Sequence, residues 1–165
     1  MLETGGSGRD AGGMTLGSAT GETTLRMDPA ALNAFLARAF PEADPAAMPR
    51  VTAAGPGRVE LVQATASRNL RPGGVISGPT LMAMADTAAY SLILAHIGEV
   101  AMAVTTSLTI HFLRPCAPGD LHAEATMLRL GRRIGTCDVL MWTEGRDRAA
   151  AKATVAYAIP EGAAR

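Results

Sequence analysis

The sequence has no excess of charge of either sign. Its 165 residues carry 15 Lys and Arg side chains and 15 Asp and Glu side chains, so the formal net charge is zero. Without a strong overall field, neither a nucleic acid nor an anionic membrane surface is predicted as a partner. Cysteine is also scarce. Cys116 and Cys137 lack CxxC spacing, which excludes a disulfide framework and a cysteine zinc site and fits a reducing, cytoplasmic setting.

Residues 1–26 lack any apolar segment. This absence argues against a signal peptide, and the Gly, Ser and Thr content predicts a flexible tail. The remaining residues, 27–165, show no internal repeat and are long enough for one domain with a real core. His96, His111 and His122 have no metal-ligand spacing, so we predict no metal site and expect each to be a surface or strand residue.

Hydrophobic periodicity divides residues 27–165 into a series of elements. Asp28 before Pro29 is typical of a helix start, and Pro41 ends the helical pattern. Alternating or β-branched runs separated by turn sequences predict strands at 57–66, 101–113, 120–130, 134–144 and 149–159. A long apolar segment without internal Gly or Pro predicts a helix at 80–97. The order indicates an α+β fold in which an antiparallel sheet, its last four strands a meander, wraps around one long central helix.

Asp86 lies inside the most hydrophobic of these segments. A carboxylate near the centre of a bilayer costs about 2.5–3.5 kcal/mol, which disfavours a membrane-spanning helix and favours a buried one. In a buried helix Asp86 has two interpretations. It is either a structural carboxylate, bonded to a backbone amide or an arginine, or a functional one. The residues that precede the helix favour the functional interpretation.

The loop before the helix contains Gly73, Gly74 and Gly78, and Pro79 begins the helix. Free amides at a helix start, with the helix dipole behind them, polarise an oxygen that carries negative charge. A carboxylate near such donors suits hydrolysis of an activated carbonyl. Ser77 is expected to cap the helix rather than act as a nucleophile, because "VISGP" is not a G-x-S-x-G elbow and no partner base is signalled.

Together these residues resemble the hotdog-fold acyl-CoA thioesterases of the phenylacetate-degradation (PaaI-like) type. That family carries His-Gly-Gly ahead of a helix, with its catalytic Asp nine residues after the His. Here "SGP", beginning at Ser77, stands in that place relative to Asp86. The stretches "VTTSLTIHFLRP" and "LGRRIGTCDVLMW" are similar to the family's next strand and hairpin, and the resemblance covers about residues 50–160. It implies a hotdog fold, hydrolysis of an acyl-CoA to free acid and CoA, and no cofactor.

The resemblance also implies roles for three residues of the catalytic centre. The backbone amide of Gly78 would polarise the thioester carbonyl. Asp86 would be the nucleophile or the base that activates water, and the hydroxyl of Thr105 would position that water.

Four further positions are implied to contact the substrate. Ser77 replaces the family's usual His, and Arg71 stands where an Asn often lies near the carbonyl. Arg132 and Arg133 lie in the hairpin whose basic residues often meet the phosphates of CoA, for which the arginine fork is suited. A solvated turn is the alternative interpretation of these two arginines.

The predicted fold also has implications for assembly. A helix that is apolar nearly all round, beside a sheet with open edges, predicts a two-fold homodimer. The family resemblance implies active sites between subunits, with Gly78 of one chain facing Asp86 of the other, and pairing of dimers into a homotetramer in many relatives. Two alternative functions stay open. One is a hotdog enoyl-thioester hydratase or dehydratase, which the missing His disfavours; the other is a non-catalytic acyl-CoA-binding protein in which Asp86 is structural.

Overall fold

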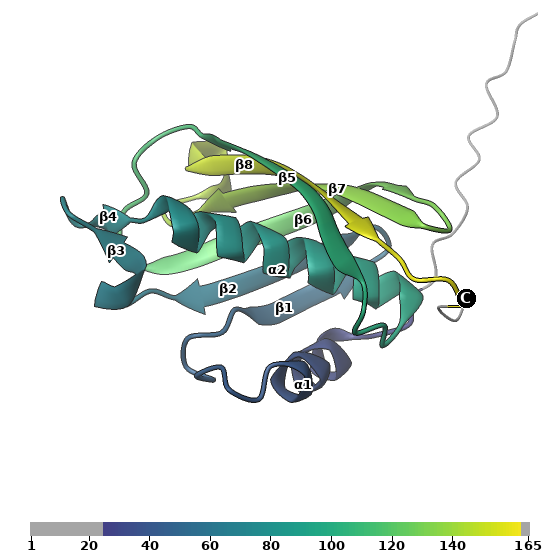
Figure 1. The fold of residues 1–165 in the computed structure, drawn as a ribbon. Coiled ribbons are helices and arrows are strands. Elements are labelled where there is room, and N and C mark those ends of the chain that lie inside the picture. The colour runs from purple at the N-terminus through teal and green to yellow at the C-terminus, as the bar shows by residue number, and fades with distance from the viewer. Residues whose placement is uncertain (1–24, 163–165) are drawn as a thin grey trace, which may run out of the picture.

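The computed structural model describes residues 25–162. A six-stranded antiparallel sheet curves around the long helix α2 (Gly78–Ile97) (Figure 1). The strands lie in the spatial order β1 (Arg50–Gly55), β2 (Arg58–Ala64), β6 (Asp120–Leu130), β7 (Ile134–Trp142), β8 (Ala151–Ala158) and β5 (Val104–Phe112). Helix α1 (Pro29–Ala39) packs beside β1, and a two-stranded hairpin of β3 (Leu70–Arg71) and β4 (Val75–Ile76) leads into α2. The predicted α+β architecture with one long central helix is confirmed.

The sheet differs from the prediction in two respects. It has six strands instead of five. The additional strand is Arg50–Gly55, which pairs with β2 across a tight turn and which the sequence pattern did not distinguish from a loop. The last four strands are also not a simple meander. Strands β6, β7 and β8 follow one another across the sheet, whereas β5 lies at the edge beyond β8 and, among the described strands, pairs with β8 alone. The chain crosses from that edge to the middle of the sheet between β5 and β6.

Local signals explain where α2 begins and ends. Ser77 is the N-cap, its hydroxyl accepting a hydrogen bond from the Thr80 amide at 3.4 Å, so the helix starts at Gly78, two residues earlier than predicted. It ends at Ile97, and the next residue, Gly98, caps it with a φ of 87°, a backbone angle that glycine adopts more readily than other residues. Thirteen of the 20 helical residues are buried, so α2 has no single apolar stripe and is a core helix.

The apolar length of α2 would suffice to cross a bilayer. Its most hydropathic window, however, is 78% buried inside the protein. The sheet therefore provides the apolar surroundings that this helix requires. One glycine allows the close contact between them, because a Cβ on Gly135 of β7 would lie 2.3 Å from Cδ1 of Ile93. Any larger residue at 135 would force the Ile93 side chain to move from its present position.

The prediction that all three histidines are surface or strand residues is wrong for His96. His96 lies in the last turn of α2 and is buried. Its Nδ1 lies 2.8 Å from the carbonyl oxygen of Leu92, and its Nε2 accepts a hydrogen bond from the Gly57 amide at 3.0 Å. The imidazole therefore fixes the β1–β2 turn to the end of the helix. His111 and His122 do lie in strands, β5 and β6.

Residues 1–24 of the predicted tail lie outside the described residues. The chain is already attached to the domain at Arg26 and Met27, whose amides both donate to the carbonyl oxygen of Ala95, at 2.7 and 3.2 Å. Met27 is buried against the core.

Candidate active site

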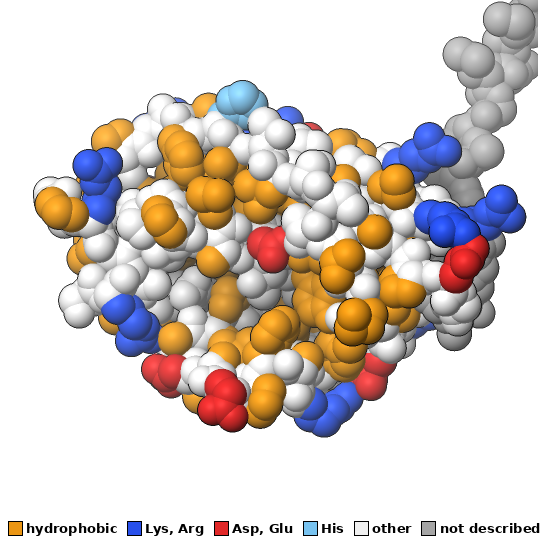
Figure 2. Space-filling view, viewed as in Figure 1, with side chains coloured by type: hydrophobic (Ala, Val, Ile, Leu, Met, Phe, Trp, Pro, Cys, Tyr) orange, Lys and Arg blue, Asp and Glu red, His pale blue; other side chains and the backbone are white. Residues whose placement is uncertain are grey.

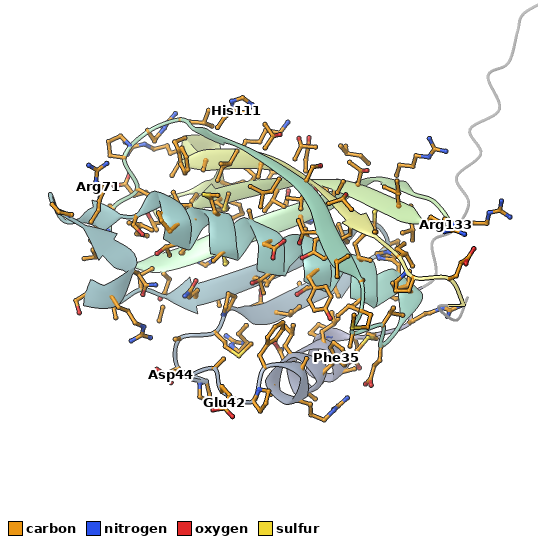
Figure 3. All side chains as sticks on the ribbon, viewed as in Figure 1. Phe35, Glu42, Asp44, Arg71, His111 and Arg133 are labelled. Carbon is orange, nitrogen blue, oxygen red and sulfur yellow. The ribbon has the colours of Figure 1, made fainter. Side chains whose placement is uncertain are left out.

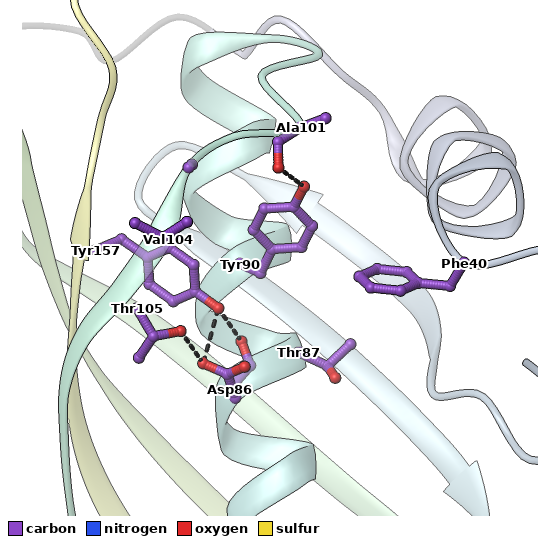
Figure 4. A pocket seen from close by; sticks show the side chains of 9 residues that line it. Phe40, Asp86, Thr87, Tyr90, Ala101, Val104, Thr105 and Tyr157 are labelled. Carbon is purple, nitrogen blue, oxygen red and sulfur yellow. Dashed lines mark hydrogen bonds between the residues drawn. The ribbon is translucent and has the colours of Figure 1, made fainter.

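Asp86 lies midway along α2, and its half-buried carboxylate contacts two hydroxyl groups (Figure 4). The Thr105 hydroxyl donates to Asp86 Oδ1 at 2.6 Å, and the Tyr157 hydroxyl donates to the same oxygen at 2.7 Å. The Tyr157 hydroxyl also lies 3.2 Å from the backbone carbonyl oxygen of Asp86. Among residues 25–162 no hydrogen bond reaches Oδ2. One carboxylate oxygen is thus held in place, and the other is left for a substrate or a water.

The pairing of β5 with β8 brings the two hydroxyls together. Thr105 and Tyr157 are direct partners in the antiparallel register, and both point toward α2. Immediately after Thr105 the register shifts, an irregularity that lies between Thr105 and Ser107. Thr105 was predicted from the sequence, whereas Tyr157 was not. The alternation in 149–159 places Tyr157 on the inner face of its strand, but only the tertiary pairing places it beside Asp86.

The electrostatics of Tyr157 keep its proton on the hydroxyl oxygen. Burial, together with the hydrogen bond to the Asp86 carboxylate, raises the pKa of Tyr157 well above its usual value of about 10. The hydroxyl is therefore a neutral donor throughout the physiological pH range. A donor of this kind holds the carboxylate without neutralising its charge.

The Asp86 side chain lines a cavity of about 240 Å³ on this face of the molecule. Its lining comprises Phe40, Asp86, Thr87, Tyr90, Ala101, Ala103, Val104, Thr105 and Tyr157. The Tyr90 ring stacks on the Tyr157 ring, with their centroids 5.7 Å apart, and its hydroxyl donates to the Ala101 carbonyl at 3.1 Å. The whole chain has three Phe, two Tyr and one Trp, so half of its aromatic residues line this one cavity.

Gly78 is the first residue of α2, where amides lack partners within the helix. Its N–H has no hydrogen-bond partner among residues 25–162, whereas Pro79 has no N–H and Thr80 is capped by Ser77. A Cβ on Gly78 would lie 3.3 Å from the Phe112 ring, so a side chain here would have to displace that ring. The geometry leaves one free amide at the helix start.

Within one chain, the predicted catalytic residues do not all meet. Gly78 and Asp86 are eight residues apart on a straight helix, which is about 12 Å at 1.5 Å per residue. Both cannot contact one carbonyl group. Asp86 and Thr105 are brought together at mid-helix, whereas Gly78 lies at the start of α2.

The predicted substrate-binding residues are also divided between two ends of the molecule. Arg71 and Ser77 lie near the start of α2, and Arg132 and Arg133 lie in the β6–β7 hairpin at the other end (Figure 3). Arg71 and Arg132 are exposed. Arg133 forms an ion pair with Glu161. Ser77 caps the helix and the two arginines lie in the predicted hairpin, whereas Arg71 lies in β3, a strand that was not predicted. One chain does not gather the four residues into a single site.

Other candidate nucleophiles are held in unreactive settings. Burial raises the pKa of Cys137 to about 12, so its thiol stays protonated. The Ser77 hydroxyl lies 2.9 Å from the Thr80 hydroxyl and caps the helix, as predicted, with no base beside it. In the described part of the chain, no group of three or more His, Cys, Asp or Glu side chains converges.

Comparisons with known proteins identify the family to which this fold belongs. The family model of the thioesterase superfamily matches residues 73–150, which include the Gly loop, Asp86 and Thr105. A crystal structure from a Silicibacter species, provisionally described as a thioesterase, is 36% identical and superposes with a TM-score of 0.76, covering 85% of this chain and 96% of that one. The N33D mutant of the phenylacetic acid degradation protein PaaI from Thermus thermophilus is 26% identical, with a TM-score of 0.60, covering 68% and 93% of the two chains.

A curated relative from Thermoplasma acidophilum, described provisionally as an esterase, is 26% identical over 83 residues. That match covers 50% of this chain and 62% of the relative. The structure, the family model and the 36% identical neighbour lead to one assignment. The chain belongs to the thioesterase superfamily, the family of enzymes that hydrolyse thioesters, and has its hotdog fold.

Proposed function

We propose that this protein hydrolyses acyl-CoA thioesters to a free acid and CoA, with Asp86 as the catalytic carboxylate. The observation that carries the proposal is the setting of Asp86. Two neutral hydroxyls hold Oδ1 at 2.6 and 2.7 Å, and the carboxylate lines a cavity large enough for a substrate group. A fixed carboxylate with one uncommitted oxygen is suited to activate water or to attack a carbonyl.

The chemistry follows from these groups. As general base, Asp86 takes a proton from a water molecule whose oxygen attacks the thioester carbon. As nucleophile, it attacks that carbon itself, and water hydrolyses the resulting anhydride. In both routes negative charge develops on the carbonyl oxygen, where an amide such as that of Gly78 would stabilise it. In both routes the C–S bond breaks as this tetrahedral species collapses, to the free acid when water has attacked and to the anhydride, which water hydrolyses next, when Asp86 has attacked. The thiolate takes up the proton released by water. A thiol with a pKa of about 8.5 is a good leaving group without a separate acid.

The separation of Gly78 from Asp86 supports a site shared between two chains. Because the two groups are about 12 Å apart in one chain, an oxyanion donor beside Asp86 has to come from elsewhere. Strand β5 leaves one edge unpaired among residues 25–162 and exposes Val104 and Phe112 by 51% and 53%. Pairing two such edges about a two-fold axis would cover both side chains and bring Gly78 of the partner toward Asp86. Dimers of this kind pairing again would form a homotetramer.

The phosphate groups of CoA are negatively charged, so a binding site for them needs cationic side chains. Arg71 and Arg132 are exposed guanidinium groups, which suit phosphate. In a two-fold dimer, the Arg71 end of one chain would approach the Arg132 end of the other. Arg133 is less available because of its ion pair with Glu161, although such exposed pairs contribute only about 0–1 kcal/mol.

Release of free thiol from a panel of acyl-CoAs tests the proposal. The panel should contain short, medium, long and aromatic acyl groups, assayed with the wild type and with Asp86→Ala. We expect turnover of at least one class by the wild type and a loss of at least about a hundredfold in the variant. A wild-type protein that binds acyl-CoA but releases no thiol from any of them would support the non-catalytic alternative. The hydratase alternative is less well supported, because none of the histidines among residues 25–162 lines the cavity of Asp86 within one chain.

A further inference from the structure

A second cavity adjoins the cavity of Asp86, between α2, β2 and the segment 40–49 that follows α1. Its volume is about 280 Å³. Its walls are formed by Phe40, Ala43, Asp44, Ala47, Met48, Pro49, Gln63, Ala83 and Thr87. Figure 2 shows hydrophobic side chains gathered around a hollow on this face, below the middle of α2. We call it the 40–49 cavity.

The polar residues of the 40–49 cavity are engaged with the protein itself. Asp44 forms an ion pair with Arg68 at 3.7 Å on the exposed rim. The Gln63 side-chain amide donates to the Ala47 carbonyl at 2.7 Å, and the Thr87 hydroxyl donates to the Ala83 carbonyl at 2.9 Å. The other six lining residues are apolar. A ligand in this cavity would therefore meet mainly hydrocarbon, which selects an apolar group.

The two cavities share a wall. Phe40 and Thr87 line both of them, and Thr87 is the residue next to Asp86 on α2. The Phe40 side chain is 49% exposed, and its ring meets the edge of Tyr90 with centroids 6.4 Å apart. An apolar chain attached to a carbonyl beside Asp86 would pass Phe40 and Thr87 and enter the 40–49 cavity.

We propose that the 40–49 cavity binds the acyl chain of the substrate, which makes the preferred substrates acyl-CoAs with a medium-length or longer apolar chain rather than acetyl-CoA. Phe40, at the junction of the two cavities, is then a specificity-determining residue. This inference rests on the proposed acyl-CoA hydrolysis and adds the substrate class and the location of its acyl group. Each methylene that leaves water for the cavity should improve binding by about fourfold.

A binding experiment tests the inference without relying on turnover. S-alkyl-CoA thioethers, which have no carbonyl to hydrolyse, are titrated against the full chain by calorimetry, from S-ethyl to S-decyl. The test variant is Ala83→Leu, which fills the 40–49 cavity from a helical position that does not line the cavity of Asp86. The matched control is Ala37→Leu. It makes the same change on an exposed helical alanine that lines a different cavity, on the other side of the same segment. Circular dichroism and light scattering establish that fold and assembly are retained.

In the wild type and in Ala37→Leu we expect affinity to rise with alkyl length, by at least about tenfold for two methylenes within the cavity. In Ala83→Leu the affinity for the longer thioethers should be at least tenfold lower than in the wild type, whereas the affinity for S-ethyl-CoA should be unchanged. A wild-type affinity that does not depend on alkyl length, or an equal length dependence in all three proteins, would overturn the inference and leave the proposed hydrolysis standing. Length-dependent binding without turnover of any acyl-CoA would instead support the cavity and refute the hydrolysis. A protein that binds none of the thioethers would refute both.

Discussion

Tyr157 donates its hydroxyl hydrogen to Oδ1 of Asp86 at 2.7 Å, across 71 positions of the sequence. The phenol is buried, and Thr105 donates to the same oxygen from the neighbouring strand. The carboxylate is therefore held by two neutral hydroxyls and not by a cation. Its charge is kept, and so is its capacity to accept a proton or attack a carbonyl.

Replacing Asp86 by Asn should lower kcat for acyl-CoA hydrolysis by about 10²–10⁴, because the amide neither accepts a proton nor attacks the carbonyl. Thiol release at saturating substrate measures the change. Asp138→Asn is a matched control, since that half-buried carboxylate on β7 bonds to Lys152 and Thr154 and does not line the cavity of Asp86. Retention of near wild-type turnover by a folded Asp86→Asn protein would refute the assignment.

Removing one of the two hydroxyls should have a smaller effect than removing the carboxylate. Tyr157→Phe and Thr105→Val each delete one hydrogen bond to a charged group, worth about 1.5–3 kcal/mol, so we expect losses in kcat of about 10–100-fold. Tyr90→Phe is the control for Tyr157→Phe, because the Tyr90 hydroxyl bonds to Ala101 and not to Asp86. If Tyr90→Phe lost as much activity as Tyr157→Phe, the loss could not be assigned to the hydrogen bond between Tyr157 and Asp86.

The raised pKa of Tyr157 predicts how stability depends on alkaline pH. In the unfolded chain this tyrosine loses its proton near pH 10, whereas burial and Asp86 keep it protonated in the fold. Above about pH 10 the folded state binds more protons than the unfolded state, so the free energy of unfolding should fall as the pH rises. The stability that the raised pKa of Tyr157 provides is fully present below about pH 10. Urea unfolding between pH 8 and 11 should show a shallower decline for Tyr157→Phe than for the wild type; parallel declines would contradict this prediction.

The two arginines of the β6–β7 hairpin should differ in their effect on CoA binding. Arg132→Ala should raise KM for acyl-CoA by about 3–10-fold, because it removes an exposed cation of the kind that pairs with phosphate. Arg133→Ala should raise it less, because Arg133 is already paired with Glu161. An acyl-pantetheine thioester, which lacks the nucleotide, serves as the control substrate and should be unaffected. An equal rise in KM for both substrates would indicate a structural turn instead.

A shared active site predicts complementation between two inactive chains. Gly78→Pro removes the amide hydrogen at the first position of α2, where proline is tolerated, and Asp86→Asn removes the carboxylate. Mixing the two by co-expression should restore about a quarter of wild-type activity, since half of the dimers are mixed and each has one intact site. Light scattering should show a dimer or larger assembly. An active monomer, or no recovery in verified mixed dimers, would refute the shared site.

Much of the fold follows from local sequence. The apolar run ending near Ile97 and the capping by Ser77 specify α2, because a helix without a polar face has to be buried and a hydroxyl at its start satisfies a free amide. Alternation specifies the inner faces of β6, β7 and β8. The single carboxylate within that apolar run singled out Asp86, and the Gly loop before it indicated the chemistry. These features depend on residues that are neighbours in sequence or one helical turn apart.

Only the tertiary structure placed β5 at the sheet edge beside β8, since strand order depends on long connections and not on the pattern within a strand. That pairing put Tyr157 opposite Thr105 and therefore onto Asp86. The 40–49 cavity likewise arises from the segment 40–49, β2 and α2 meeting in space. The distance between Gly78 and Asp86 could be read from helical geometry, but the partner of Asp86 could not. The position of a residue in the sequence determines on which face of a helix or strand its side chain lies. Which other residues that face contacts is determined by how elements distant in the sequence pack together.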